Sequence, residues 1–186
     1  MAFDGFVISN LVYELNNTIL NAKISKIAQP ETDELLFTLK GSNDQYRLAM
    51  SASASLPFLY LTDANKPSPL TAPNFCMLLR KHLVGARITG ISQPDFERML
   101  VLDLDGRDEL GTPVKKQLIV EMLGRQSNVI LVSADGHIID CMRRVDSSMS
   151  ETRQVQPGLF YRLPLRQDKP VLADEVAGWL KAGGLR

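Results

Sequence analysis

An internal repeat constrains the fold of this chain more strongly than any other feature of its sequence. Residues 22–37 align with residues 86–101 without a gap, and each copy directly follows an amphipathic helical pattern. The identical pairs are Ala22/Ala86, Ile24/Ile88, Ile27/Ile91, Gln29/Gln93, Pro30/Pro94 and Leu36/Leu100. We interpret the repeat as a duplicated unit of helix, strand, turn and strand. Because proline cannot donate to a strand ladder, the shared Gln-Pro-acid segment is expected to form the turn between the two strands of each unit.

Two amphipathic helices are predicted from the spacing of apolar residues. The first covers residues 3–20, where four-residue intervals place apolar side chains on one face. Its stripe consists of Phe3, Val7, Leu11, Leu15 and Ile19, widened by Ile8 and Val12. The second covers residues 72–83 and follows a proline-rich loop at residues 65–74, with Thr71 as its expected N-cap.

The rest of the chain consists mainly of short strand-like runs separated by polar turns. The strands predicted beyond the repeat cover residues 45–50, 57–63, 116–123, 128–132 and 137–145. Together these patterns predict an α+β fold, an antiparallel β-sandwich or barrel with two long helices and an internally duplicated helix–β-hairpin unit. Residues 1–170 are expected to form one domain. Residues 171–186 are expected to begin a following helical region of a longer protein.

Composition and charge exclude several classes of protein. Lys+Arg and Asp+Glu are both 21, so the net charge is +0, which argues against a free-standing nucleic-acid binder but leaves room for a local basic face. No apolar run approaches the ~18 residues that a membrane span needs, and the start of the chain lacks a basic signal-peptide region. Cys76 and Cys141 lie far apart in apolar contexts and are expected to be buried, reduced thiols. We therefore expect a cytoplasmic protein.

The sequence shows no catalytic constellation. His82 and His137 have no cysteine or carboxylate at ligand spacing, and no nucleophile elbow, P-loop or GxGxxG motif occurs. Asp103 and Asp105 form a DxD-like pair, but the segment "DLDGRDELG" is more typical of a hairpin turn than of a metal site. The chain is therefore expected to be no enzyme and to hold no metal and no cofactor.

Three clusters of polar residues are candidates for ligand contacts. Glu97 and Arg98 take the repeat position where the first copy has Asp33 and Glu34, so a cation is introduced in the second copy only. The alternative for this pair is a surface ion pair of ~0–1 kcal/mol.

The second cluster is the turn "EMLGRQSN" at residues 121–128. It combines a glycine with Arg125, Ser127 and Asn128, and such a bend can present N–H groups and a guanidinium to a phosphate. An ordinary polar hairpin turn is the alternative. The third is the pair Arg143 and Arg144, expected on a strand with side chains on opposite faces, so that one is a candidate phosphate contact.

Several strings together resemble one protein family. They are "MAFDG", "APNFCMLLRKHLVGARI", "ISQPDFERM", "EMLGRQSNVILV", "GHIIDCMRRV" and "RQVQPGLFYRLP". In this order they are similar to the N-terminal domain of the NFACT family, whose bacterial members are called RqcH or, by an older label, fibronectin-binding protein FbpA, and whose eukaryotic relative is NEMF. The same fold resembles the N-terminal domain of MutM-type DNA glycosylases.

The resemblance implies a factor of ribosome-associated quality control. Family members bind a large ribosomal subunit carrying peptidyl-tRNA and recruit charged tRNA, alanyl-tRNA in bacteria, for C-terminal tailing of the stalled chain. The family engages tRNA through an Asp-Arg pair and a Glu-Ile-Met-type motif. The matching positions are Glu97, Arg98, Glu121, Met122 and Leu123. Arg125, Ser127, Asn128, Arg143 and Arg144 would add contacts, and no membrane or small-molecule substrate is implied.

Two alternative functions remain. The older family label implies a surface adhesin that binds fibronectin, although the sequence shows no signal peptide and no fibronectin-binding repeat. The glycosylase-like fold implies a DNA-binding domain for DNA repair. Glycosylases of that type use an N-terminal proline followed by a glutamate, whereas Ala2 and Phe3 stand here and no CxxC pair for a zinc finger appears.

Overall fold

The computed structural model describes residues 4–164 and places one antiparallel sheet at the centre of the molecule. Two α-helices lie in this part of the chain, α1 (Gly5–Thr18) and α2 (Asn74–Leu83). The sheet has nine strands in the order β4-β3-β2-β1-β5-β6-β7-β8-β9. The strands of the first half are β1 (Lys23–Glu31), β2 (Glu34–Lys40), β3 (Gln45–Ser51) and β4 (Phe58–Thr62). Those of the second half are β5 (Arg87–Ser92), β6 (Met99–Arg107), β7 (Pro113–Glu121), β8 (Asn128–Ser133) and β9 (Ile138–Cys141).

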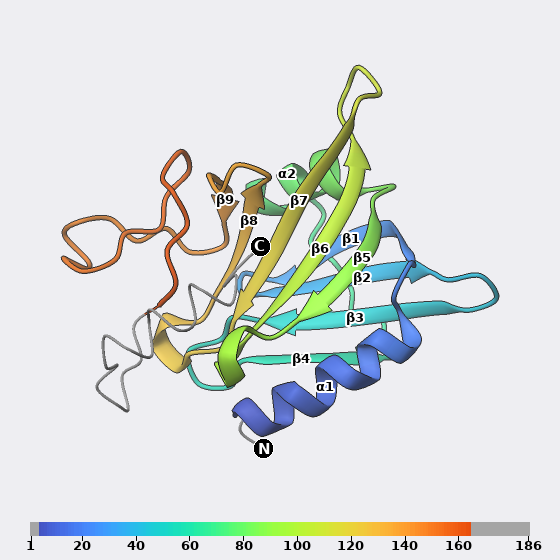
Figure 1. The fold of residues 1–186 in the computed structure, drawn as a ribbon, viewed down its shortest axis with the longest axis horizontal. Helices are drawn as coiled ribbons and strands as arrows, with labels where there is room; N and C mark the ends of the chain where they lie inside the picture. The colour runs from blue at the N-terminus through green and yellow to red at the C-terminus, as the bar shows by residue number, and fades with distance from the viewer. Residues whose placement is uncertain (1–3, 165–186) are drawn as a thin grey trace.

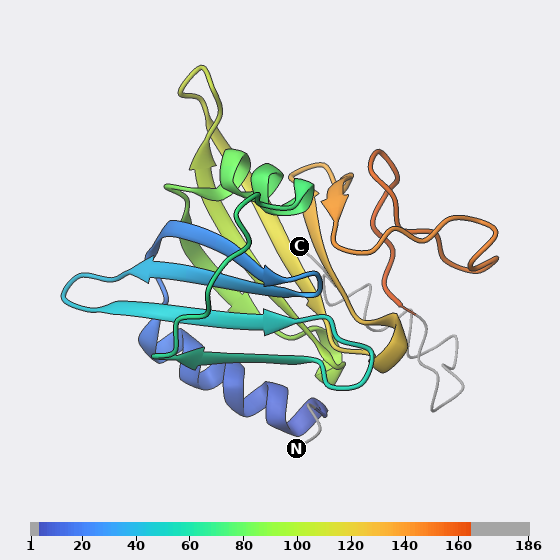
Figure 2. The same cartoon turned by 180° about the vertical axis from the view of Figure 1, so that it is seen from behind.

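The sheet folds over on itself into two layers. Strands β2–β4 cross behind β6 and β7 in Figure 1 and in front of them in Figure 2, with α1 and α2 at opposite open ends between the layers. Alternate side chains of both halves point inward, as the two-residue period of a strand requires, and join the helices in one core. Its fully buried members include Leu15, Phe37, Leu48, Leu79 and Leu102. The predicted α+β fold with two helices is therefore confirmed.

The two repeat copies meet at the junction of β1 and β5 through reciprocal backbone hydrogen bonds. The N–H of Ile24 donates to the carbonyl of Ala86 at 2.8 Å, and the N–H of Ile88 donates to the carbonyl of Ala22 at 2.9 Å. Ile24 and Ala22 in the first copy align with Ile88 and Ala86 in the second, so each bond is the counterpart of the other. The duplicated sequence thus builds a pseudo-twofold joint at the centre of the sheet.

The turns that precede the two strands also match. Asn21 and Gly85 occupy equivalent positions, and both have positive φ angles, 71° and 90°. Their N–H groups donate to Ile88 and Ile24 across the joint, each at 2.7 Å. Asparagine and glycine are residues that tolerate this left-handed conformation, which lets the chain leave each helix and enter the central strands.

Each helix is tied to the strand of the other copy. The Asn16 side chain in α1 donates from Nδ2 to the Ile91 carbonyl in β5 at 3.1 Å. At the equivalent position in α2, Arg80 donates from Nε to the Ile27 carbonyl in β1 at 2.8 Å. α1 accordingly packs against β5 and β6, and α2 packs against β1, β6 and β9. The two copies are therefore interlocked and cannot form separate domains.

The ungapped alignment of the repeat is wrong beyond the turn. In the second copy a short 3₁₀ turn, η1 (Pro94–Phe96), follows β5, as predicted, but in the first copy Pro30 and Glu31 still belong to β1. The extra residue shifts the second copy by one position. The Arg98 carbonyl accepts from the Met122 N–H at 2.8 Å, just as the Asp33 carbonyl accepts from the Ala52 N–H. Arg98 therefore corresponds to Asp33 and not to Glu34.

Other local predictions also need correction. α2 begins at Asn74 with Pro73 at the N-cap position and no side-chain cap, so Thr71 does not cap it. Asp103 and Asp105 lie within β6, and the hairpin turn comes after them. β9 ends at Cys141, well short of the predicted strand at 137–145. The Asn128 side chain holds the next residues, accepting from the Arg143 N–H at 2.9 Å and donating to its carbonyl at 2.7 Å.

Three further predictions concern the cysteines, a membrane span and the C-terminal residues. Cys76 and Cys141 are free and buried, as expected. Neither helix within residues 4–164 has the length and apolar character of a membrane span. The expected start of a helical region at residues 171–186 lies outside the described residues.

Replacing the central core leucine of either helix by alanine should destabilise the protein to a similar extent. Leu15 and Leu79 are equivalent in the repeat, and both are fully buried. We expect Leu15→Ala and Leu79→Ala each to lower the free energy of unfolding by about 2–5 kcal/mol, measured by urea denaturation. Tyr13→Ala, at an exposed position of α1, is the control with a change within about 0.5 kcal/mol. A small effect at only one leucine would contradict the interlocked arrangement.

Candidate nucleic-acid interface

The predicted contact residues gather at one end of the second half of the sheet. Met99, at the start of β6, pairs with Glu121 at the end of β7, and Glu121 pairs with Asn128 at the start of β8. The segment before β6 therefore lies beside the segment after β7. Sequence separation hides this proximity, and the antiparallel register creates it.

The Glu97–Arg98 pair is held by its backbone from two sides. The Gln93 side chain donates from Nε2 to the Glu97 carbonyl at 2.8 Å and to the Gly5 carbonyl at 3.0 Å, which links the pair to the start of α1. The Arg98 carbonyl accepts from the Met122 N–H on the other side. Both side chains are partly exposed. The backbone is thus fixed while the Arg98 guanidinium remains within reach of a ligand.

Glu121 lies inside the protein and forms a buried ion pair. Its side chain is 0% exposed, and Arg153, 14% exposed, donates to both carboxylate oxygens, at 2.9 and 2.6 Å. The Tyr161 hydroxyl donates to the same carboxylate at 2.5 Å. A bidentate charged pair of this kind has strong, directional hydrogen bonds. Glu121 therefore fastens the arm formed by residues 145–164 to the end of β7.

Burial and charge shift the pKa values of the partners of Glu121. Burial, together with the negative charge of Glu121, raises the pKa of Tyr161 well above its usual range. Burial opposes the charge of Arg153, but the hydrogen bonds and charge of Glu121 outweigh burial and raise its pKa. The Arg153 guanidinium also lies 5.4 Å from the centre of the Tyr161 ring. The net result is that Arg153 is charged and Tyr161 neutral at physiological pH.

The sequence contains one local signal for this cluster. Glu121 lies in the run "LIVEML", where the neighbours are apolar and belong to a strand buried on both faces. A carboxylate in such a run requires a buried cationic partner. Nothing in the local pattern identifies Arg153 or Tyr161 as that partner.

The turn after β7 uses most of its polar groups internally. Ser127 is fully buried, and its Oγ accepts from the Leu123 N–H at 2.9 Å. The N–H groups of Gln126 and Ser127 donate within the turn, to Leu123 and Gly124. Gly124 has a φ of +61°, a conformation that side chains rarely adopt. Arg125 is the exposed cation at the tip. Ser127 and Asn128 instead hold the backbone of the turn and of the segment after β9 in place.

The two arginines after β9 have different environments, and neither lies on a strand. The Arg143 guanidinium points toward the turn after β7. It donates to the carbonyl of Arg125 and, at 3.3 Å, to the carbonyl of Ala52. Arg144 is 64% exposed and pairs with Asp140 at 3.4 Å. Arg144 is the more exposed of the two, and the predicted strand alternation is wrong because a bend separates them.

A cleft of about 490 Å³ lies between this turn and the arm. Three guanidinium groups, two hydroxyls and two amides line it. These belong to Arg125, Arg143, Arg153, Ser150, Thr152, Gln126 and Asn128. Because Glu121 neutralises Arg153, the surplus positive charge comes from the other two arginines. Such a wall suits an anionic group, for example a phosphate, which arginine can bind bidentately.

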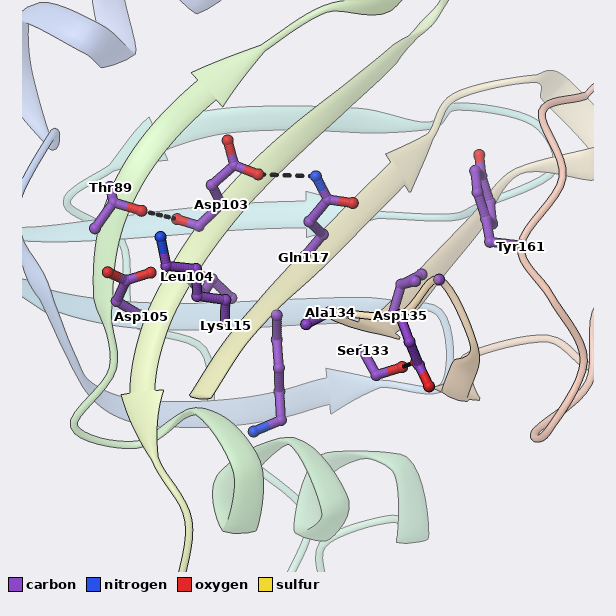
Figure 3. Close-up of a pocket in the computed structure, with 13 residues that line it drawn as sticks. Thr89, Asp103, Leu104, Asp105, Lys115, Gln117, Ser133, Ala134, Asp135 and Tyr161 are labelled. Atoms are coloured by element: carbon purple, nitrogen blue, oxygen red, sulfur yellow. Dashed lines mark hydrogen bonds between the residues drawn. The ribbon is translucent and has the colours of Figure 1, made fainter. Parts of the chain in front are cut away.

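A second cleft, of about 580 Å³, lies on the outer face of β6–β8 and has a different character (Figure 3). Asp103 accepts from the Gln117 side chain at 2.9 Å. The three aspartates of the cleft outnumber its two lysines, so its charge is less suited to phosphate; they are Asp103, Asp105 and Asp135 against Lys115 and Lys116. A Cβ on Gly90 would lie 2.6 Å from the Asp103 carboxylate, which explains the glycine. Within residues 4–164 no group of three potential metal ligands occurs.

Comparison with known proteins gives a consistent family assignment. The family model described as NFACT N-terminal and middle domains matches residues 4–182. The Rqc2 homolog RqcH of Bacillus subtilis is 36% identical over 178 residues, which is 94% of this chain and 31% of that protein. The Ribosome quality control complex subunit 2 of Saccharomyces cerevisiae is 29% identical over 146 residues, 78% of this chain and 13% of that protein. The chain thus spans less than a third of the length of these relatives.

Solved structures share the fold over nearly the whole chain. The N-terminal domain of the fibronectin-binding protein PavA from Streptococcus pneumoniae has a TM-score of 0.86 and 29% identity, covering 97% of this chain and 69% of that chain. The N-terminal part of the fibronectin/fibrinogen-binding protein from Streptococcus suis has a TM-score of 0.86 and 30% identity, covering 96% and 69%. These neighbours confirm the predicted fold.

Removing the cation of the buried pair should be far more damaging than removing an exposed one. Arg153→Met leaves Glu121 buried without a counter-charge, so we expect the free energy of unfolding to fall by about 3–5 kcal/mol. The triple variant Glu121→Leu/Arg153→Met/Tyr161→Phe should recover most of this loss, because no buried polar side chain of the cluster is left unpaired and the Arg162 carbonyl, which loses the Arg153 Nε donor, is at an exposed position. Arg144→Met removes an exposed guanidinium from its pair with Asp140, whose side chain is 11% exposed, and is the control with a smaller loss. Urea denaturation measures all three, and equal losses for the two arginines would contradict the assignment.

Two aspartates of the second cleft should affect stability in opposite directions as the pH changes. Burial raises the pKa of Asp103, so its contribution to stability is present below the pKa of the unfolded chain and is lost as the pH rises through the folded pKa. Asp103→Asn should therefore gain stability over the parent chain at neutral pH. Hydrogen bonds from Ser133 and His137 lower the pKa of Asp135 to about 2, so Asp135→Asn should lose stability at neutral pH. Unfolding curves recorded from acidic to neutral pH measure both changes. A loss of stability for Asp103→Asn, or a gain for Asp135→Asn, at neutral pH would refute this prediction.

Proposed function

The chain belongs to the NFACT family, and from this premise we propose that it is the RNA-binding domain of a ribosome-associated quality-control factor. In this proposal the domain engages tRNA and a large ribosomal subunit that carries peptidyl-tRNA. It is not an enzyme and requires no cofactor, because its task is to bind and orient RNA. It acts where ribosomes act, in the cytoplasm.

One observation carries the proposal. Four segments that resemble the tRNA-engaging positions of the family, or that flank them, converge at one end of the sheet. They contain Glu97 and Arg98, the motif at residues 121–123, Arg125, and Arg143 with Arg144. A cleft with two surplus guanidinium groups opens beside them. Convergence of cations from distant segments is what an RNA contact surface requires.

The residues at this interface divide into contacting and positioning groups. Arg98 contacts a phosphate or a base edge, with Glu97 beside it to orient the guanidinium. Arg125 and Arg144 add exposed cations. Glu121, Met122 and Leu123 act from inside the fold.

These three motif residues act by different contacts. Glu121 fastens the arm through Arg153, the Met122 N–H holds the backbone of Arg98, and the Leu123 N–H closes the turn onto Ser127. The Glu-Met-Leu motif therefore shapes the interface without touching the RNA.

The remaining regions of the full-length factor would supply the rest of the activity. The chain spans less than a third of its relatives, and with a net charge of +0 it offers few surplus cations. Since affinity for RNA scales with the number of phosphates neutralised, the isolated chain should bind weakly. Recruitment of charged tRNA for tailing, alanyl-tRNA in bacteria, is proposed for the whole factor.

A second candidate function comes from the names of the structural neighbours. Those proteins are described as binding fibronectin or fibrinogen. An adhesin would need a protein-binding surface on this domain. Measuring the binding of fibronectin and of tRNA to the same preparation separates the two functions, and the proposal requires that tRNA binds the more tightly.

Replacing Arg98 should weaken RNA binding without unfolding the domain. We expect Arg98→Ala to reduce affinity for unfractionated tRNA about tenfold, because a charge-assisted contact is lost, and to reduce tail synthesis by the full-length factor on large subunits. Arg98→Lys keeps the charge but not the fork of donors and should recover only part of the affinity. Lys81→Ala removes an exposed cation from α2 and serves as the matched control. Unchanged tRNA affinity in Arg98→Ala, with native circular dichroism, would refute the assignment.

A further inference from the structure

A row of three cations crosses the central joint on the outer face of the sheet. Lys23 in β1 lies directly opposite Lys40 in β2 and directly opposite Arg87 in β5. Residues directly opposite each other in antiparallel strands point to the same face. All three are exposed. We name these residues the basic row.

Two further cations extend the basic row toward β4. In the next row of the sheet, Lys26 lies opposite Thr38, and Thr38 lies opposite Arg47. Arg47 donates to the Asp63 carbonyl at 3.0 Å, and Arg87 donates to the Asn21 carbonyl at 2.9 Å.

These cations have little neutralisation from within the protein. None of the five forms an ion pair with another residue between 4 and 164. The carboxylate nearest in register is Asp105, which lies opposite Arg87 in β6. The basic row and its extension therefore form a local positive face on a chain of net charge +0.

The arrangement opposes folding and so calls for an explanation outside the fold. Like charges directly opposite each other across strands are destabilising, and Lys23 has such a neighbour on both sides. Exposed lysines contribute no core packing that would offset the repulsion. A ligand that supplies negative charge along the row would relieve it.

The residue types favour nucleic acid over an acidic protein. Lysine is depleted at protein–protein interfaces, whereas Lys and Arg supply most contacts to phosphates. Tyr60, exposed on the same face and two residues from the partner of Arg47, adds an aromatic ring on which a base can stack. The segment between β4 and α2 crosses this face in Figure 2, and Leu36 and Ala49 on the same face are buried, whereas the three residues of the basic row are exposed.

The basic row lies far from the interface at Arg98. Arg87 is opposite Asp105 in β6, and Arg98 precedes Asp105 by seven residues, or about 23 Å of extended chain. One RNA phosphate group cannot contact both places. We propose that the basic row binds the phosphate backbone of a second RNA segment, so that the domain bridges two RNA segments. This inference rests on the proposed function, because it assumes that the first segment is bound at Arg98.

Charge reversal at one residue of the basic row and one residue of its extension tests the inference. Lys23→Glu/Lys26→Glu should weaken binding of a short RNA duplex at least about tenfold and reduce the slope of log affinity against log salt by about two. The variant should melt at or above the parent temperature, because Glu at position 23 relieves repulsion with Lys40 and Arg87. Lys81→Glu/Arg162→Glu changes the net charge equally at exposed sites elsewhere and should alter affinity far less. Lys23→Arg/Lys26→Arg should bind like the parent chain.

The outcomes separate this inference from the proposed function. If Lys23→Glu/Lys26→Glu binds the duplex like the parent while Arg98→Ala still loses tRNA, the second contact is refuted and the proposed function stands. If neither variant changes binding, both are refuted. If the double variant loses binding to poly-glutamate and not to RNA, the face serves an acidic protein and the inference is overturned.

Discussion

The reciprocal hydrogen bonds between β1 and β5 are the contact on which the rest of the structure depends. They join two copies of one helix–hairpin unit into a single sheet, with Ile24 and Ile88 donating across the joint to Ala86 and Ala22. Each helix is then anchored on a strand of the other copy, so neither copy has a complete core alone. The same joint aligns the starts of β1 and β5, which brings Lys23 opposite Arg87 and creates the positive outer face.

Departures from the duplication coincide with the candidate interface. In the first copy a two-residue turn ends in Asp33, whereas the second copy has a 3₁₀ turn followed by Arg98. At the position of Ser51 in the first copy, the second has the buried Glu121 and its partner Arg153. The repeat thus provides a common scaffold, and the second copy alone carries the charged groups and the fastened arm that form a cleft.

The charge distribution bears on how a chain of net charge +0 would bind RNA, as we propose. Three carboxylates, those of Asp103, Asp105 and Asp135, line the cleft on the outer face of β6–β8 together with Lys115 and Lys116. The cations lie at the Arg98 end and along the basic row. Separation of charge over the surface, and not net charge, determines where a polyanion can bind. Glu121 contributes by neutralising one arginine internally, which leaves the exposed ones to face a ligand.

The sequence by itself determined the elements whose signals are local. Apolar spacing identified both helices, and the repeat identified the duplicated unit, because these patterns report which faces are buried. The resemblance of short strings also identified the family. Only the tertiary structure decided which residues meet across strands. The partner of Glu121 is 32 residues away, the one-residue shift at Arg98 depends on the turn after β5, and Arg143 lies in a bend held by Asn128. Register between distant strands is set by the whole fold, so no local pattern could reveal these contacts or align Lys40, Lys23 and Arg87 in one row.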